Sequence, residues 1–145
     1  MESENQPRGE QTRSMILEAA RHLFVKNGFH GTSMRQIARA AGVALGGIYN
    51  HFASKEDLFV SVIEAYHPYR EILAVLEQAQ VETIEDFVYL TASNMKAAVD
   101  RRPDFLNLML IEIVEFNSRH VVQLYQFILP QFAEIVQAFI ARQAN

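Results

Sequence analysis

Residues 42–58 read Gly-Val-Ala-Leu-Gly-Gly-Ile-Tyr-Asn-His-Phe-Ala-Ser-Lys-Glu-Asp-Leu. Ala38 lies four residues before Gly42, and Ile48 lies six residues after it. This spacing is typical of a helix-turn-helix, because the alanine lets a second helix cross close by, the glycine ends the first helix in the left-handed conformation, and the isoleucine fills the crossing. The spacing therefore predicts a short recognition helix from about Ala44 to His51.

Two helices are predicted before this turn. From Thr12 onward, apolar residues recur at helical spacing until Gly28, which suits the left-handed residue that ends a helix. The next helix begins at Ser33, whose hydroxyl can accept the backbone N–H of Gln36 while the Gln36 side chain reaches back to Ser33. The front of the chain is therefore predicted to be a bundle of three helices.

Several polar side chains are expected to face away from this bundle. Tyr49 and His51 can contact phosphates or bases, with packing on neighbouring helices as the alternative, and Asn50 suits adenine. Lys55 is a cation in the first turn of a helix, where the dipole favours an anion, and a DNA phosphate would explain it. Exposed hydroxyls and N–H groups around Ser33 can cap the helix, bind a phosphate, or do both. The predicted DNA-binding residues are Thr32, Ser33, Ala44, Leu45, Gly46, Gly47, Tyr49, Asn50, His51 and Lys55.

The composition divides the chain in two. Half of the 145 residues are apolar, the net charge is −4, and the absence of cysteine excludes disulfides and zinc fingers. Residues 1–58 carry seven Lys and Arg against six acidic residues, whereas residues 59–145 carry six against eleven. Because salt screens charges beyond about 10 Å, a nucleic acid at the front would meet the local basic excess rather than the net charge.

One pattern of residues runs through the front of the chain. Its members are Arg13, Ile16-Leu17, Ala19-Ala20, Leu23-Phe24, Gly28, Thr32-Ser33, Ile37-Ala38, Ala41-Gly42-Val43, Gly46, Ile48-Tyr49, His51-Phe52, Ser54-Lys55-Glu56 and Leu58. Over about residues 12–59 the pattern resembles the DNA-binding domain of the TetR family of bacterial transcriptional regulators. The resemblance implies a head whose third helix enters the major groove of double-stranded DNA. It also implies a helical body that binds a small molecule and forms a homodimer on two-fold symmetric operator half-sites.

The sequence departs from the family pattern at two positions. Ala44 replaces a residue that usually carries a hydroxyl, and Gly47 stands where serine or threonine is common. Both changes remove expected contacts, so recognition should depend on Tyr49, Asn50, His51, Lys55 and backbone N–H groups. Gly46 and Gly47 also weaken the short helix by about 1 kcal/mol each.

Helical patterns continue to the end of the chain. A helix is predicted to start at Ser54, and its apolar stripe, residues 58–76, keeps its phase through Pro68, which predicts one kinked helix rather than two. Further helices are predicted over residues 83–102, 103–116 and 119–144, the last with a kink at Pro130. The predicted fold class is all-α, with a three-helix helix-turn-helix head and a helical ligand-binding and dimerisation body.

The rear helices are rich in Phe, Met, Tyr and Leu, as a malleable apolar pocket requires, although any helical core has this composition. Glu112 and Glu115 lie one turn apart. Facing inward they would select a cationic ligand or, with His120, a metal; an exposed acidic strip is the interpretation that we favour. We predict a small hydrophobic or cationic ligand, with no metal and no cofactor. The predicted pocket residues are Tyr66, Met95, Phe105, Met109, Glu112, Phe116 and Tyr125.

The predicted function is a DNA-binding transcriptional regulator, a repressor that a small-molecule ligand releases from its operator. The sequence lacks a nucleophile beside a base, a phosphate-binding glycine loop and a His-x-x-x-His motif, so no enzyme is expected. Two alternatives remain, a DNA-binding protein whose rear helices bind a protein partner, and a helical-bundle enzyme.

The predicted domains are a flexible N-terminal tail at residues 1–11, a DNA-binding domain at 12–58 and a regulatory domain at 59–145. The family usually continues with two more helices that form the dimer interface, so the regulatory domain is expected to be incomplete. Polar residues break every apolar run before about 20 residues, and the N-terminus lacks a signal-peptide core. The expected location is therefore the cytoplasm, with no membrane partner.

Overall fold

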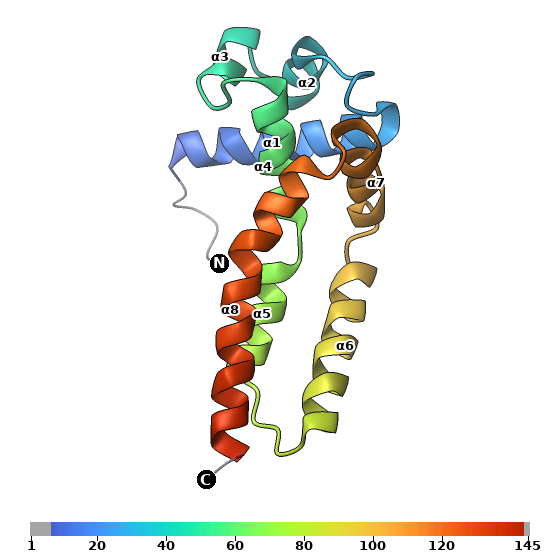
Figure 1. Cartoon of the computed structure of the whole chain (residues 1–145). Helices are drawn as coiled ribbons and strands as arrows, with labels where there is room; N and C mark the ends of the chain where they lie inside the picture. The colour runs from blue at the N-terminus through green and yellow to red at the C-terminus, as the bar shows by residue number, and fades with distance from the viewer. Residues whose placement is uncertain (1–6, 144–145) are drawn as a thin grey trace. The chain divides into compact units, whose positions relative to one another are not determined.

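The computed structural model describes residues 7–143, and the described residues form eight α-helices without a strand (Figure 1). The helices are α1 (Arg8–Asn27), α2 (Met34–Ala41), α3 (Leu45–Tyr49), α4 (Lys55–Tyr66), α5 (Tyr69–Glu77), α6 (Ile84–Asp100), α7 (Phe105–Phe116) and α8 (Arg119–Gln143). The all-α prediction is confirmed.

The described residues form two compact units. The head unit comprises those up to Ala65 together with Asn107–Ile111, and the rear unit comprises Tyr66–Leu106 and those from Glu112 onward. The helix α7 therefore contributes residues to both units.

Three phenylalanine rings form the centre of the head unit. Phe24 stacks on Phe29 with ring centroids 5.7 Å apart, and Phe59 meets the two rings edge-on at 5.3 and 5.6 Å. All three rings are buried, as are Ile37 and Ile48 from α2 and α3. Burial of a large apolar side chain stabilises a fold by about 1.5–3 kcal/mol, so this cluster fixes α1, α2, α3 and α4 together.

The first helix begins earlier than the sequence pattern predicted. It starts at Arg8 rather than Thr12, because Pro7 has no N–H to leave unpaired and its carbonyl accepts the N–H groups of Glu10 and Gln11. The predicted tail therefore does not extend over residues 8–11. Its residues 1–6 lie outside the described part of the chain.

The prediction of one kinked helix through Pro68 is wrong. The helix α4 ends at Tyr66, and α5 begins at Tyr69 as a separate helix. Proline disfavours the helical conformation in the residue before it and clashes with the carbonyl four residues back, which here belongs to Glu64. The break is then stabilised by His67, whose Nδ1 accepts the backbone N–H of Tyr69 at 3.2 Å.

In the rear unit, α5 contacts both α6 and α8 (Figure 1). Thr83 caps the N-terminus of α6, close to where this helix was predicted to begin. Phe87 of α6 stacks on Phe139 of α8, with ring centroids 4.8 Å apart. An ion-pair cluster also joins α5 to the end of α6, where the Glu71 carboxylate meets the guanidinium groups of Arg101 and Arg102. These contacts form a three-helix arrangement around α5.

By length and composition alone, α8 could cross a membrane, because it has 25 residues and an 18-residue window of it has a mean hydropathy of 1.2. In the structure, 17% of that window is buried. A helix of a globular core can meet the same criterion. The buried residues of α8 are Leu124, Ile128, Ile135 and Phe139, and the helix packs against α5.

Candidate DNA-binding surface and ligand cavity

The turn between α2 and α3 has the predicted helix-turn-helix geometry. The Ser33 hydroxyl accepts the Gln36 N–H at 3.2 Å, and the Gln36 side chain accepts the Ser33 N–H at 2.8 Å. Gly42 is left-handed at φ 71°, and the N–H of Val43 bonds to the Ala38 carbonyl at 3.0 Å. These bonds end α2 sharply and turn the chain into α3.

Only five residues form α3, fewer than the predicted span from Ala44 to His51. Ile48 anchors it with no exposed surface, while Tyr49 keeps 51% of its surface exposed. The other predicted contacts on this segment divide into exposed Ala44, Gly46 and Asn50, and half-buried Leu45, Gly47 and His51. The helix therefore presents a surface on which Tyr49 is the largest exposed side chain.

Lys55 is hydrogen-bonded to the backbone of the head unit, a role that the sequence did not indicate. Its Nζ donates to the carbonyls of Phe29 and Thr32, each at 2.9 Å, and lies 4.2 Å from the centroid of the Phe29 ring. An ammonium group has three donors, so one remains for a phosphate. The observed contacts provide a structural reason for a cation in the first turn of α4.

The structure buries Thr32, which the sequence analysis placed among the DNA-binding residues. The sequence indicated an exposed hydroxyl, but this residue is 1% exposed and its hydroxyl donates to the carbonyls of Leu23 and Gly28 at 3.0 and 2.8 Å. The side chain thus fastens the loop after α1, and its hydroxyl proton is already used within the head unit. Ser33 beside it is exposed.

An open groove brings several of the predicted residues together on the head unit. Ser33 lines it from the start of α2, Tyr49 from the end of α3 and Lys55 from the start of α4. The Lys55 ammonium, the Tyr49 phenol and the His30 imidazole, which also lines this groove, lie near the N-terminus of α2 and would suit a phosphate. This groove and the exposed side of α3 form the candidate DNA-binding surface.

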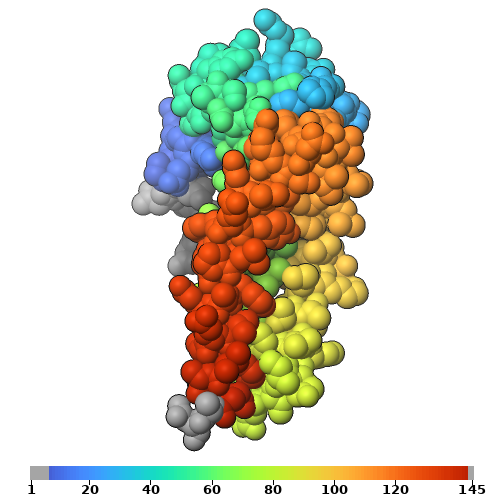
Figure 2. All heavy atoms as spheres, viewed as in Figure 1, coloured from blue at the N-terminus to red at the C-terminus, as the bar shows by residue number. Residues whose placement is uncertain are grey.

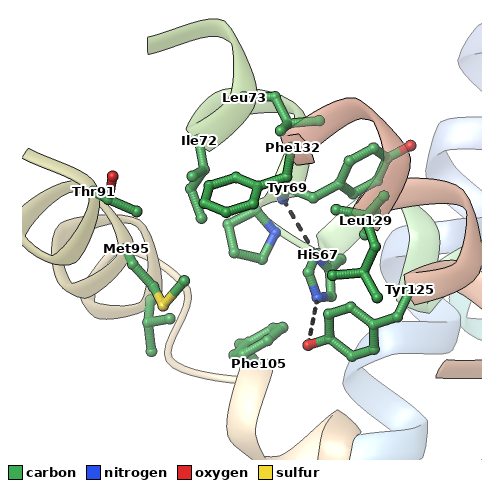
Figure 3. Close-up of a pocket in the computed structure, with 13 residues that line it drawn as sticks. His67, Tyr69, Ile72, Leu73, Thr91, Met95, Phe105, Tyr125, Leu129 and Phe132 are labelled. Atoms are coloured by element: carbon green, nitrogen blue, oxygen red, sulfur yellow. Dashed lines mark hydrogen bonds between the residues drawn. The ribbon is translucent and has the colours of Figure 1, made fainter. Parts of the chain in front are cut away.

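The rear unit holds a cavity of about 320 Å³ (Figure 3). Its lining comes from the break at His67 and Pro68, from α5, α6 and α8, and from Phe105 at the start of α7. Aromatic rings surround one end, where His67 meets Phe105 edge-on at 5.3 Å and Tyr125 at 5.7 Å. A cavity of this size and character is in the range of small-molecule sites.

Comparison with known proteins finds similar sequences and similar folds among bacterial regulators. A family model described as bacterial regulatory proteins, tetR family, matches residues 16–62. The transcriptional regulator UidR of Escherichia coli (strain K12) is 44% identical over 63 residues, which cover 43% of this chain and 30% of UidR. A protein assigned to the tetR-family transcription regulators of Shewanella sp. PV-4 has a crystal structure that covers 90% of this chain and 71% of its own, with 26% identity and a TM-score of 0.72. Residues 16–62 thus match the tetR family of bacterial regulatory proteins, and the described fold resembles that of a TetR-family regulator.

The similarity in sequence is concentrated in the TetR DNA-binding domain. The HTH-type transcriptional repressor BepR of Brucella suis biovar 1 (strain 1330) is 38% identical and covers 53% of this chain and 43% of BepR. The chain thus spans less than half the length of these curated relatives. These relatives are named transcriptional regulators, the function that the sequence resemblance implied.

The rear-unit cavity includes three of the seven predicted pocket residues. Met95, Phe105 and Tyr125 line it. The other four, Tyr66, Met109, Glu112 and Phe116, do not line it, and Met109 belongs to the head unit. Sequence reasoning missed His67, because the helix break that turns it toward Tyr125 was not predicted. It also missed Thr91 on α6.

Glu112 neither lines the cavity nor belongs to an exposed acidic strip, the two positions that the sequence analysis considered. It has no exposed surface, so it is not part of an acidic strip. Its Oε1 accepts the N–H groups of His120 and Val121 at 2.6 and 3.1 Å, and its Oε2 lies 2.9 Å from His120 Nδ1. The carboxylate thus stabilises the N-terminus of α8, where the helix dipole favours an anion.

Proposed function

We propose that the chain is a DNA-binding transcriptional regulator that acts as a repressor on an operator in double-stranded DNA. The observation that carries this proposal is the short helix α3, anchored by buried Ile48 and presented by a capped α2 and a left-handed Gly42, with Tyr49 and Asn50 exposed. BepR, a relative with the same domain, is named a repressor. Regulators of this kind act where the chromosome is, so we assign the chain to the cytoplasm.

We further propose a homodimer that binds two-fold symmetric half-sites. A five-residue recognition helix makes few base contacts, so specificity requires a second head. The rear unit exposes many large apolar side chains, and Figure 2 shows α8, in orange and red, uncovered along much of the face toward the viewer. Exposed apolar patches favour association. These residues are Ile84, Val88, Tyr89, Met95, Leu106, Ile113, Val114, Val122, Tyr125, Phe127, Leu129 and Ile140.

The ligand response is proposed to begin in the rear-unit cavity. A ligand among α5, α6 and α8 would change the packing at His67, which directly follows the last residue of α4 along the chain. Because α4 carries the head, a change in its direction would alter the separation of two heads and release the operator. The alternative is that the rear helices bind a protein partner. The exposed apolar residues of the rear unit would support this alternative, whereas the cavity supports a small-molecule ligand.

DNA binding can be tested by fluorescence anisotropy with DNA from upstream of the chain's own gene, across a salt series. We expect affinity to fall as salt rises, and Tyr49→Ala to weaken binding about fivefold or more. The control is Met15→Ala on α1, because Met15 is 54% exposed and belongs neither to the DNA-binding surface nor to the exposed apolar residues of the rear unit. Binding that is independent of salt, or equal losses in the two variants, would show that α3 is not the DNA-reading element.

The homodimer and the partner alternative separate in solution. Light scattering coupled to size-exclusion chromatography should give twice the mass of 16.6 kDa for the purified chain. Val114→Glu, at a residue that is 75% exposed, should produce a monomer that is still folded. A wild-type monomer at every concentration tested would contradict the homodimer and favour a different protein as the partner.

A further inference from the structure

The polar end of the rear-unit cavity restricts what the cavity can bind, an inference that rests on the ligand response proposed above. Four lining side chains carry polar atoms, namely His67, Tyr69, Thr91 and Tyr125, and no lining side chain carries a carboxylate, ammonium or guanidinium group. The ligand must therefore satisfy the donors and acceptors of these four residues.

The hydrogen bonds of His67 fix its tautomer. Its Nδ1 accepts the backbone N–H of Tyr69 at 3.2 Å and so cannot carry a proton. The proton of the neutral ring is then on Nε2, which lies 3.5 Å from the Tyr125 hydroxyl oxygen (Figure 3). His67 is the donor in that contact, and the Tyr125 oxygen is the acceptor.

The Tyr125 hydroxyl consequently keeps its own proton for another acceptor. Thr91 donates its hydroxyl proton to the Phe87 carbonyl at 2.8 Å. The Tyr69 hydroxyl accepts Arg70 Nε at 2.9 Å, and in Figure 3 it points away from Thr91, Met95 and Phe105. In Figure 3 the Tyr125 hydroxyl lies beside His67 and Phe105, at the aromatic end of the cavity. A ligand that enters this end meets one donor.

The charged groups that neighbour lining residues already have partners, and Arg70 donates its Nε to the Tyr69 hydroxyl. Glu71 binds both Arg101 and Arg102, and the Glu112 carboxylate binds the start of α8. An ion in the apolar cavity would lose its hydration without meeting a free counter-charge. This removes the reason for expecting a cationic ligand, which depended on Glu112 facing the pocket.

We infer that the cavity binds a neutral, mainly apolar molecule with one hydrogen-bond acceptor, and that this acceptor receives the Tyr125 hydroxyl proton. Apolar rings and side chains hold the body of the ligand, and Tyr125 sets its orientation. Tyr125 is thus the specificity-determining residue of the site.

Four naphthalenes of similar size test this inference by isothermal titration calorimetry on the full chain. They are 2-acetylnaphthalene with a carbonyl acceptor, 2-ethylnaphthalene without one, the 2-naphthoate anion and the 2-naphthylmethylammonium cation. We expect the ketone to bind three- to tenfold more tightly than the hydrocarbon, as one net hydrogen bond implies, and at least tenfold more tightly than either ion.

Two variants assign the binding to the cavity and to Tyr125. Tyr125→Phe keeps the ring and should remove the preference for the ketone while leaving the affinity for the hydrocarbon within twofold. Leu129→Trp fills the cavity mouth from a residue that is 59% exposed, and should weaken both neutral compounds. Binding that Leu129→Trp leaves unchanged would assign these compounds to the exposed apolar surface and overturn the inference.

Three further results would overturn it: an ion that binds as tightly as the ketone, a preference for the ketone that survives in Tyr125→Phe, or no binding of any of the four compounds. The proposed function fails separately, because operator binding is measured without ligand. If an ion binds in a manner sensitive to Leu129→Trp and releases the operator, the ligand-responsive regulator stands and the ligand class is wrong.

Discussion

The ammonium group of Lys55 lies 2.9 Å from the carbonyl oxygen of Thr32 and donates a hydrogen bond to it. This bond, with the equal one to Phe29, ties the first turn of α4 to the loop before α2. A residue chosen from the sequence as a phosphate contact is thus part of the structure that positions α2. Any loss of DNA binding on its removal therefore needs a measurement of stability beside it.

We predict that Lys55→Met lowers the free energy of unfolding by about 1–2 kcal/mol, because two carbonyls lose a charged donor while the aliphatic stem is kept. Urea denaturation followed by circular dichroism measures the change. Lys96→Met is the matched control, since Lys96 pairs with Asp100 on the surface at 78% exposure and should contribute less than about 0.5 kcal/mol. Equal effects of the two substitutions would contradict the structural role of Lys55.

Two glycines of the head unit should respond to alanine in opposite directions. A Cβ at Gly46 would have no atom within 4 Å, so Gly46→Ala should stabilise the domain by about 0.5–1 kcal/mol through helix propensity. A Cβ at Gly31 would lie 2.1 Å from the Asn27 carbonyl oxygen, so Gly31→Ala should destabilise it by about 1–3 kcal/mol. Thermal melts of the two variants measure both signs, and a shared sign would show that one local geometry is wrong.

Features with local causes could be predicted from the sequence. The capping box at Ser33 and the left-handed Gly42 depend on residues within four positions of one another, and the structure has both. The end of α1 at Gly28, with Phe29 folded onto Phe24, has the same local origin. These short-range rules were enough to define the helix-turn-helix.

Features that depend on distant partners could not be predicted in this way. Thr32 and Lys55 are 23 residues apart, and no periodicity indicates that one binds the carbonyl of the other. Glu112 is buried because the backbone of α8 returns to it, and an amphipathic pattern on α7 alone does not show this. The helical spacing of apolar residues continues through Pro68, although α4 ends before it. The spacing continues because Tyr69 and Leu73 are buried on a separate helix, α5. Two of the residues that line the cavity, His67 and Pro68, lie at that break.

Glu112 gives a third prediction. Glu112→Ala should lower the free energy of unfolding by about 2–4 kcal/mol, because two N–H groups at the start of α8 and the His120 ring lose a buried acceptor. Glu112→Gln should cost less, since its carbonyl oxygen can replace Oε1. Glu115→Ala, on the same helix and half-buried, is the control. Denaturant unfolding of the three variants should rank Glu112→Ala as the most destabilising, and a ranking with Glu115→Ala first would contradict the capping role.

The state of His67 gives a prediction about pH. Burial, with a smaller contribution from the positive charge of Arg102, lowers the pKa of His67 to about 4, whereas an unfolded histidine titrates near 6.5. Between these values the unfolded chain binds the proton and the folded chain does not, so the free energy of unfolding should be highest above pH 6.5 and fall toward pH 4. The ring is partly exposed, and solvent screening reduces the loss to on the order of 1–2 kcal/mol. Urea titrations at pH 7 and pH 5 should show this loss in the wild type, and His67→Asn, which keeps an acceptor for the Tyr69 N–H, should lose correspondingly less. If both proteins lose the same stability over this interval, another group is responsible and the neutral His67 that orients Tyr125 is not supported.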